Sequence, residues 1–271
     1  MNLEFRADLH CHSICSDGSD TPLDLLSKAK QLRLSGISIT DHDTIQAYSS
    51  EFFAYARALD ISILPGVEFS SELHETTIHV LGYGFDLRSP SLLAFIEEMQ
   101  RRRRERNKAI LQKLEKYHIS IAEEEIFSAS SSIGRPHIAA LMLKKGYASS
   151  FQEAFDRYLK EGALCYVPGF KFTPLEAIQA IHEARGKAVL AHPHFIKNGS
   201  YIGSLLSLPF DGIECYYANL PKHQETPWVK IAKQKGWIAT GGSDYHGTFK
   251  PHISLGCSWV GESTFHQLLA E

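Results

Sequence analysis

The chain has 271 residues, of which 44% are hydrophobic and 22% charged, and its formal net charge is −3. This size suffices for one α/β domain with a full core, and the charge gives no global case for nucleic-acid binding, although a local basic patch stays open. No apolar run reaches membrane-spanning length, and the N-terminus lacks a signal-peptide pattern. Five cysteines without a Cys-x-x-Cys spacing predict a reduced, cytoplasmic protein, and the sequence indicates no obligate protein partner.

Short apolar runs of strand length alternate with helical patterns along most of the chain. The expected strands are Leu3–Leu9, Gly36–Thr40, Ile61–Leu64, Thr77–Tyr83, Lys187–Ala191, Gly212–Tyr217 and Trp237–Thr240. The helices expected between them are Pro22–Leu34, Gln46–Leu59, Thr173–Arg185 and Lys222–Lys235. Alternation of this kind is typical of a parallel α/β sheet or barrel, and seven strands are one short of an eightfold barrel.

The alternation stops between about residues 89 and 166, where no strand signal of similar quality is found. The helical patterns in this part cover Pro90–Tyr117, Ala122–Phe127, Pro136–Lys145 and Ser150–Lys160. We therefore predict two parts. Residues 1–89 and 166–271 form the α/β barrel, and residues 90–165 form an all-helical insertion that contributes to substrate binding.

Histidines and aspartates gather in three short segments that each follow an apolar run, namely Asp8-Leu-His10-Cys-His12, Asp41-His42-Asp43 and Asp244-Tyr-His246. Alternate residues of a strand share one face, so His10 and His12 can bind one ion while Cys11 points into packing. Ligands from distant strands can meet at the carboxyl edge of a barrel sheet, where Glu68 is placed to bridge two ions. The pattern predicts a multinuclear metal site for phosphate-ester hydrolysis.

With these segments, the chain resembles the PHP family, which is named after polymerase and histidinol phosphatase. The further motifs that carry the resemblance are Ser16-Asp17-Gly18, Pro65-Gly-Val-Glu68, His79 and Ala191-His192-Pro193. The resemblance implies a distorted seven-stranded β/α barrel that holds two or three divalent metal ions. Manganese is the first expectation, and zinc and iron(II) also accept such nitrogen and oxygen ligands.

The resemblance also implies which residues bind each ion. The ligands of the first ion would be His10, His12, Glu68 and Asp244. Glu68 would bridge to a second ion, whose other ligands would be His79 and His192. The ligands of the third ion would be Asp17, His42 and His246. The residues interpreted as partners that orient the ligand imidazoles are Asp8, Asp41 and Asp43.

Gly134-Arg135-Pro136-His137 opens a helix in the predicted insertion. A helix N-terminus favours anions, and arginine offers a planar fork that matches phosphate oxygens. The segment resembles an element of PHP proteins that act on nucleotide phosphates, which implies substrate-binding roles for Arg135 and His137. His194 either assists proton transfer or faces solvent. We interpret the arginine-rich run Arg101–Arg106 as a solvated helix face, with contact to a nucleic-acid backbone as the alternative.

We therefore expect a metal-dependent phosphohydrolase that uses a metal-activated hydroxide to release phosphate from a nucleoside 5′-monophosphate or 3′,5′-bisphosphate. A 5′→3′ exoribonuclease on short RNA and a histidinol phosphatase would share every metal ligand, and the Gly-Arg-Pro-His element disfavours the latter. A non-catalytic metal-binding module is a further alternative, against which the apparently complete ligand set weighs. An amidohydrolase also begins with His-x-His, but Asp41-His42 and Glu68 fit the PHP pattern better.

Overall fold

In the computed structural model, which describes residues 4–74, 76–127, 132–168, 172–196 and 198–269, eight strands form two sheets. The first sheet is parallel, and its strands in spatial order are β1 (Ala7–Cys11), β2 (Gly36–Ile39) and β3 (Ser62–Ile63). The strands of the second sheet in spatial order are β4 (Gly66–Leu73), β5 (Thr76–Tyr83), β6 (Lys187–Leu190), β7 (Gly212–Tyr217) and β8 (Ile238–Gly242). β5 runs antiparallel to both β4 and β6, whereas β6, β7 and β8 are parallel. The predicted α/β class is confirmed.

The two sheets meet at isolated bridges rather than along continuous ladders. Cys11 pairs in parallel with Tyr245, just past β8, and His42, just past β2, pairs in parallel with Glu68 on β4. Neither sheet closes on itself, so the predicted seven-stranded barrel is not confirmed, and β4 is a strand that the sequence pattern missed. Polar residues in the second half of β4 weaken its strand signal, although most of the strand is buried. Glu68 accordingly lies on a strand, not in the loop where it was expected.

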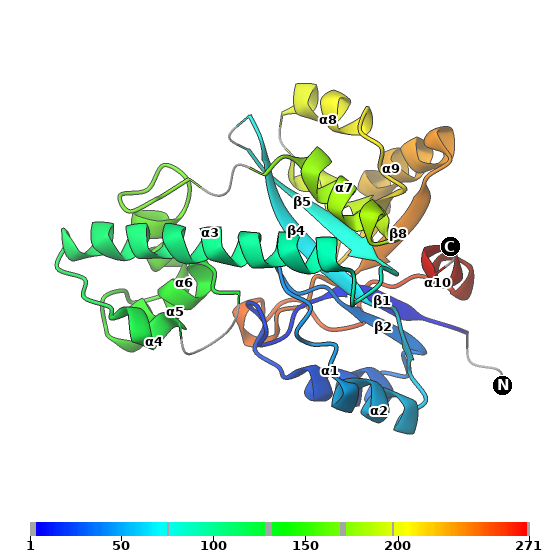
Figure 1. The fold of residues 1–271 in the computed structure, drawn as a ribbon, viewed down its shortest axis with the longest axis horizontal. Helices are drawn as coiled ribbons and strands as arrows, with labels where there is room; N and C mark the ends of the chain where they lie inside the picture. Colours follow the sequence, from blue (N-terminus) through cyan, green and yellow to red (C-terminus); the bar gives the residue numbers. More distant parts are fainter. Residues whose placement is uncertain (1–3, 75, 128–131, 169–171, 197, 270–271) are drawn as a thin grey trace.

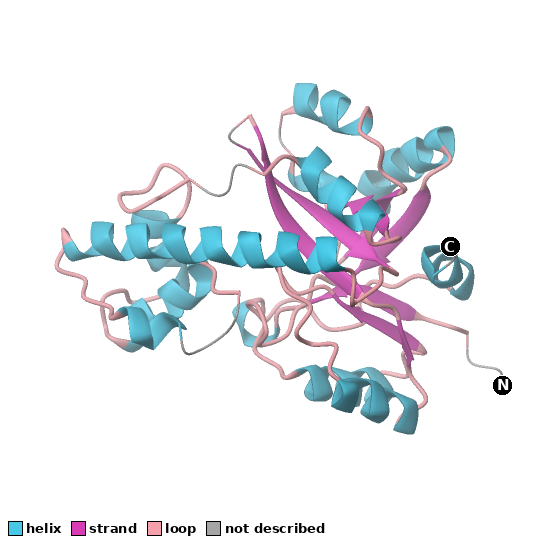
Figure 2. Ribbon diagram, viewed as in Figure 1, coloured by secondary structure: helices cyan, strands magenta, loops and turns pink. Residues whose placement is uncertain are grey.

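Helices cover the outer faces of the sheets (Figures 1 and 2). The helices that pack on the first sheet are α1 (Pro22–Gln31) and α2 (Ser50–Ala58). The helices that pack on the second sheet are α7 (Pro174–Glu183), α8 (Gly199–Leu206) and α9 (Lys222–Lys235). Capping boxes at Thr21 and Thr173 fix the starts of α1 and α7, where the sequence placed them. α10 (Glu262–Leu269) buries Phe265 and Leu268 against strand residues of both sheets.

Residues 90–165 are helical in their described part. α3 (Pro90–Glu115) extends away from the sheets, and shorter helices lie beside its far half (Figure 1). These are α4 (Glu123–Phe127), α5 (Arg135–Lys144), α6 (Phe151–Ala154) and the π-helical turn Phe155–Leu159. The first half of α3 packs against β4 and β5 through Leu92, Ile96 and Met99, whereas its second half belongs to a separate cluster with α5. One continuous helix therefore connects two hydrophobic cores.

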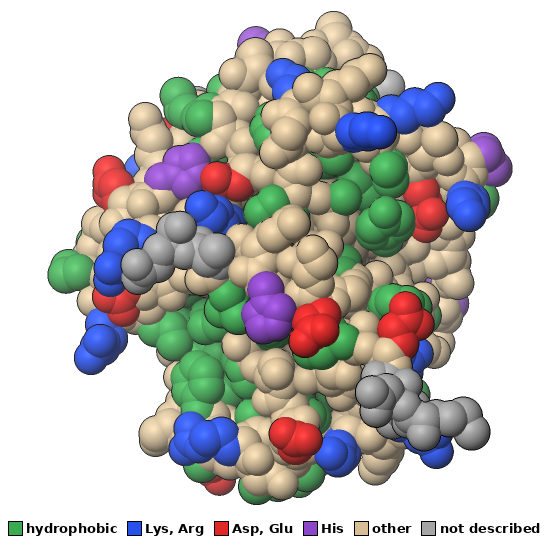
Figure 3. All heavy atoms as spheres, turned by 90° about the vertical axis from the view of Figure 1, so that its right-hand side faces the viewer, with side chains coloured by type: hydrophobic (Ala, Val, Ile, Leu, Met, Phe, Trp, Pro, Cys, Tyr) green, Lys and Arg blue, Asp and Glu red, His purple; other side chains and the backbone are tan. Residues whose placement is uncertain are grey.

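The surface and the helices agree with the composition. None of the helices in the described residues is both long and apolar enough to cross a membrane. On the face shown in Figure 3, positive and negative side chains are interspersed rather than gathered by sign.

The two short 3-10 turns, Pro193–Phe195 and Gly247–Phe249, follow β6 and β8 at the end of the sheet that carries the candidate site.

We predict that Met99→Ala lowers the free energy of unfolding by about 2–5 kcal/mol, because the fully buried side chain fixes α3 to the sheet. Leu93→Ala, on the same helix but 44% exposed, is expected to change it by less than about 0.5 kcal/mol. Urea unfolding in the presence of a chelator measures both. Equal effects of the two substitutions would contradict the packing of α3.

Candidate metal centre and anion-binding cavity

Six strands and the loops that follow four of them bring all nine predicted metal ligands together. They are His10, His12, Asp17, His42, Glu68, His79, His192, Asp244 and His246. His10 and Glu68 lie on β1 and β4, and His79 lies on β5, while most of the others lie in the loops that follow β1, β2, β6 and β8. Close packing around these residues requires glycine at position 242, since a side chain there would overlap the backbone and Cβ of His10.

One group of potential ligands consists of His10, His12, Glu68 and Asp244, all of them buried. The Nε2 atom of His10 lies 3.2 Å from Glu68 Oε2 and 3.5 Å from Asp244 Oδ1. The Nε2 atom of His12 lies 3.1 Å and 3.3 Å from the same two oxygens. Two nitrogens and two oxygens therefore face a common point.

Two further groups share residues with the first. His42, Glu68 and His79 form one, in which His79 Nδ1 lies 2.7 Å from Glu68 Oε1. The Nε2 atom of His192 lies 2.9 Å from the same oxygen. The residues of the other group are His12, Asp17, His42 and His246. His42 connects the two, because its Nδ1 faces Glu68 at 3.3 Å and its Nε2 faces Asp17 at 3.7 Å.

Orphaned nitrogens show that these groups fit divalent metal ions. His12 Nε2 and His42 Nδ1 are buried without a hydrogen-bond partner, although Glu68 Oε2 lies near both. A buried polar atom left unsatisfied is costly, and an ion between nitrogen and oxygen would satisfy both. Burial alone would raise the pKa of Glu68, but nearby His79, His42 and His10 lower it well below its usual value, so the carboxylate is available as a ligand. Manganese, iron and zinc all match this donor set.

Glu214 on β7 is a site residue that the sequence analysis did not assign. Its Oε1 lies 2.8 Å from His10 Nδ1, and its Oε2 accepts a hydrogen bond of 2.7 Å from the backbone N–H of His192. A carboxylate in this position fixes the tautomer and the orientation of a ligand imidazole. The available signal was a lone glutamate inside an otherwise apolar and aromatic strand.

Asp244 is held by two groups on its second oxygen. Tyr217 donates its hydroxyl to Oδ2 at 2.6 Å, and Lys250 contacts the same atom at 2.6 Å. Burial by itself would raise the pKa of Asp244, but Lys250, His246 and His10 lower it well below the usual value. The left-handed backbone at Asp244, with φ of 55°, is uncommon for a residue other than glycine and aims the side chain into the cluster.

Of the three aspartates that we expected to orient imidazoles, Asp41 reaches one through a serine, and Asp8 and Asp43 make other contacts. Asp8 accepts hydrogen bonds from the backbone N–H groups of three residues, namely His10, Ser243 and Gly256. Asp41 accepts hydrogen bonds from Ser13 and Ser16, and Ser16 in turn lies 3.4 Å from His12 Nδ1. Asp43 pairs with Arg103. Among these described contacts, only Asp41 reaches a ligand imidazole, and it does so through a serine.

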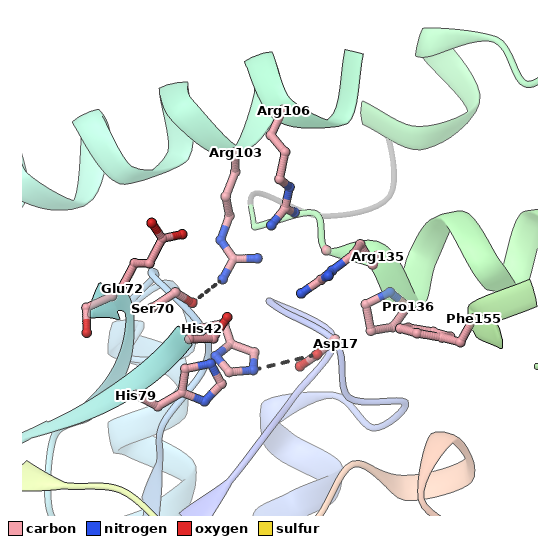
Figure 4. Close-up of a pocket in the computed structure, with 13 residues that line it drawn as sticks. Asp17, His42, Ser70, Glu72, His79, Arg103, Arg106, Arg135, Pro136 and Phe155 are labelled. Carbon is pink, nitrogen blue, oxygen red and sulfur yellow. Dashed lines mark hydrogen bonds and ion pairs between the residues drawn. The ribbon is translucent and has the colours of Figure 1, made fainter. Parts of the chain in front are cut away.

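Three arginines converge on a cavity of about 190 Å³ beside the cluster (Figure 4). Arg103 and Arg106 point down from α3, and Arg135 points in from the start of α5, toward Asp17, His42 and His79. Burial and then the charges of Arg103 and Arg135 lower the pKa of Arg106 well below its usual value. Glu72 also lines the cavity, at the other end from Arg135. The concentration of positive charge suits a polyanionic ligand.

The solvated-face interpretation of the arginine run is wrong for two of its members. Arg101 and Arg102 pair with Glu98 at 2.7 Å and 2.6 Å, as expected on a solvated face. Arg103 is 6% exposed and contacts Asp43 and Ser70, and Arg106 lines the cavity. The signal was present in the spacing of the buried residues of α3, which are Leu92, Ile96, Met99, Arg103, Asn107, Ile110, Leu111 and Leu114.

His137 and His194, the other two predicted site residues, lie nearby but do not line this cavity. The Nδ1 atom of His137 accepts a hydrogen bond of 3.1 Å from the backbone N–H of Gly134, so His137 stabilises the start of the helix that presents Arg135. The ring of His194 packs between Phe195 and Tyr217, with ring centroids 4.2 Å and 4.6 Å away. Its Nδ1 is buried without a hydrogen-bond partner.

Comparison with known proteins matches this geometry to a family. The model of the PHP domain matches residues 8–164. The chain belongs to the PHP family. Its relatives include the 5′-3′ exoribonuclease Rnm of Escherichia coli, which is 33% identical over 92% of this chain and 87% of that protein. Two more relatives are 29% identical: a phosphoribosyl 1,2-cyclic phosphate 1,2-diphosphodiesterase of Eggerthella lenta, over 92% and 97% of the two chains, and a 3′,5′-nucleoside bisphosphate phosphatase of Chromobacterium violaceum, over 88% and 86%.

A solved structure supports the same assignment. A protein of Bifidobacterium adolescentis described as a metal-dependent phosphoesterase superimposes with a TM-score of 0.87 and 26% identity, covering 97% of this chain and 95% of that one. This PHP protein is a phosphoric ester hydrolase, and its histidine and carboxylate cluster can bind metal ions. The names of these relatives refer to three different phosphate esters.

We predict that Glu214→Gln weakens metal binding by about 10- to 100-fold, because His10 loses the carboxylate that orients it. Glu262→Gln, an exposed glutamate at the start of α10, serves as the matched control and should bind metal like the wild type. Metal content after competition with a graded chelator provides the measurement. An unchanged affinity in the Glu214 variant would show that this carboxylate does not support the ligand.

A second prediction concerns pH. Burial alone would lower the pKa of His12, but the nearby carboxylates of Asp244 and Glu68 outweigh it and raise the pKa to about 9. A metal ligand must be neutral, so His12 has to release a proton when a metal binds at pH 7. We expect the affinity for manganese to rise by up to about tenfold per pH unit between pH 6.5 and 8.5. Calorimetry in buffers of different ionisation enthalpy detects the released proton, and a pH-independent affinity would contradict the assignment.

Proposed function

We propose that this PHP protein is a metal-dependent phosphohydrolase whose substrate is a nucleotide with two phosphate groups, such as a nucleoside 3′,5′-bisphosphate. The convergence of Arg103, Arg106 and Arg135 beside the ligand cluster carries the proposal. One phosphate ester would lie at the metal centre and be hydrolysed, while the other would lie among the guanidinium groups.

The charges in the cavity favour a second phosphate over a neutral or cationic group. Asp43 already pairs with Arg103, but the guanidinium groups of Arg106 and Arg135 repel each other, and a phosphate dianion would relieve that repulsion through charge-assisted hydrogen bonds. A nucleoside 5′-monophosphate has one phosphate and cannot occupy both places. Histidinol phosphate also has one phosphate, and its amino group is cationic, so the arginines disfavour it. The amidohydrolase and binding-module alternatives do not account for this cavity.

The roles of the protein's own groups follow from their positions. When bound, divalent ions supply an activated water and neutralise charge on the phosphoryl oxygens. The residues that would hold those ions are His10, His12, Asp17, His42, Glu68, His79, His192, Asp244 and His246. Glu214 and Tyr217 orient His10 and Asp244, and His137 holds the helix start that presents Arg135. His194, beside His192, stays a candidate for proton transfer to the leaving group.

A 5′→3′ exoribonuclease acting on short RNA is the second candidate. It is favoured by the E. coli relative, which carries that name and aligns over 92% of this chain. The first nucleotide of a 5′-phosphorylated RNA presents the same pair of groups as the bisphosphate, a 5′-phosphate and a 3′-phosphate ester. Recognition of the 5′-phosphate by the arginines would therefore serve both substrates, and the two activities differ only in what is attached to the 3′-phosphate.

We predict that Arg135→Ala and Arg106→Ala each raise the KM for adenosine 3′,5′-bisphosphate by about 10- to 150-fold, because each removes a charge-assisted hydrogen bond. Arg104→Ala, an exposed arginine of α3, is the control. Phosphate release with manganese is measured on this compound, adenosine 5′-monophosphate, histidinol phosphate and a 5′-phosphorylated RNA pentamer.

The set of substrates separates the alternatives. A larger loss with the bisphosphate or the RNA than with the monophosphate supports a second phosphate site. Turnover of histidinol phosphate alone would reject the nucleotide assignment and leave the metal centre intact. No turnover of any substrate by protein that has bound metal would favour the metal-binding module.

A further inference from the structure

A second cavity, of about 450 Å³, adjoins the arginine cavity. The residues that line both are Asp17, His42, Pro136 and Phe155. The first cavity carries guanidinium groups, whereas the second carries the rings of Phe151, Phe155 and Phe249. A cationic cavity and an aromatic cavity therefore meet at two of the proposed metal ligands.

Two of the rings come from the insertion and the third from the turn after β8, and neighbouring rings are tilted rather than parallel. The ring centroids of Phe151 and Phe155 are 5.2 Å apart with an angle of 35° between the planes. Phe249, in the turn after β8, lies 5.8 Å from Phe151 at 34°. Phe155 begins the π-helical turn Phe155–Leu159, a rare conformation that is frequent at functional sites.

Packing between the insertion and the sheets would be a simpler reason for these rings. Phe151 and Phe155 do pack against the hydrophobic core around α5. Phe249 belongs to none of the hydrophobic clusters found among the described residues, and it stays partly exposed on the cavity wall. Core packing therefore accounts for two of the rings, whereas Phe249 contacts the ring of Phe151 and keeps part of its surface on the cavity wall.

We propose that the aromatic cavity binds the nucleobase of the substrate by stacking, an inference that rests on the proposed function. A nucleotide joins anionic phosphates to a flat base, and every base offers a face for stacking on aromatic rings. Apart from Asp17, His42 and His246 of the ligand cluster, the polar lining consists of Gln152, the ion pair of Lys160 with Asp156 at 2.9 Å, and Lys250, which pairs with Asp244. Stacking rather than edge recognition would dominate, so we expect all four bases to be accepted.

The test compares 2′-deoxyadenosine 3′,5′-bisphosphate with its abasic tetrahydrofuran analogue, which keeps both phosphates. Phe249→Ala is expected to raise the KM for the base-containing compound by about 5- to 150-fold and to leave the KM for the analogue unchanged. Phe249→Tyr should retain stacking, and Tyr117→Ala, an exposed aromatic residue of the insertion outside the cavity, is the control. An equal change for both compounds, or no change, would overturn the proposal.

Binding of 2-aminopurine nucleoside 3′,5′-bisphosphate separates this proposal from the proposed function, since stacking quenches its fluorescence. Quenching that disappears in Phe249→Ala supports the base site even where the wild type hydrolyses no nucleotide, an outcome that rejects the proposed function alone. Hydrolysis of the bisphosphate without quenching, and at equal KM for the abasic analogue, rejects the base site alone. Neither binding nor hydrolysis rejects both.

Discussion

The buried carboxylate of Glu68 is the interaction on which the arrangement of the strands depends. Its two oxygens lie within 3.3 Å of five imidazoles, those of His10, His12, His42, His79 and His192. A carboxylate removed from water is costly unless charged or hydrogen-bonding groups surround it. The ends of β1, β2, β5 and β6 must therefore meet around β4. Because the clustered side chains come from separate strands, a metal ion bound among them would stabilise the packing of the sheets.

The α/β class and all nine clustered residues were predictable, because strand patterns and the order of motifs are local features of the sequence. Glu214 was not, since its role depends on contact with His10, which is 204 residues away in sequence. β4 was missed because a strand buried on both faces beside a polar site has no simple alternation of apolar and polar residues. That omission also made the seven-strand count too low.

The arginines of α3 show how composition can mislead. The composition of Arg101–Arg106 is typical of an exposed helix face, and Arg101 and Arg102 do pair with Glu98. The helical period nevertheless places Arg103 on the same side of α3 as Met99 and Ile110, and the side chains on that side are buried. The period, rather than the charge, decides which arginines reach the cavity. Arg103 then pairs with Asp43, which ties the helix to the loop after β2.

The candidate metal ligands and the residues that line the cavities come mostly from different parts of the chain, which suggests how PHP proteins acquire different substrates. The candidate metal ligands lie on strands and strand ends around one buried carboxylate. Arg103, Arg106, Arg135, Phe151 and Phe155 belong instead to residues 90–165, whose helices have a hydrophobic core of their own. Substitutions of Arg106, Arg135, Phe151 or Phe155 would alter charge and shape at the cavities, whereas a substitution of Arg103 would also break its pair with Asp43, next to His42. Relatives that align over most of this chain while carrying the names of three different phosphoesterases are consistent with that arrangement.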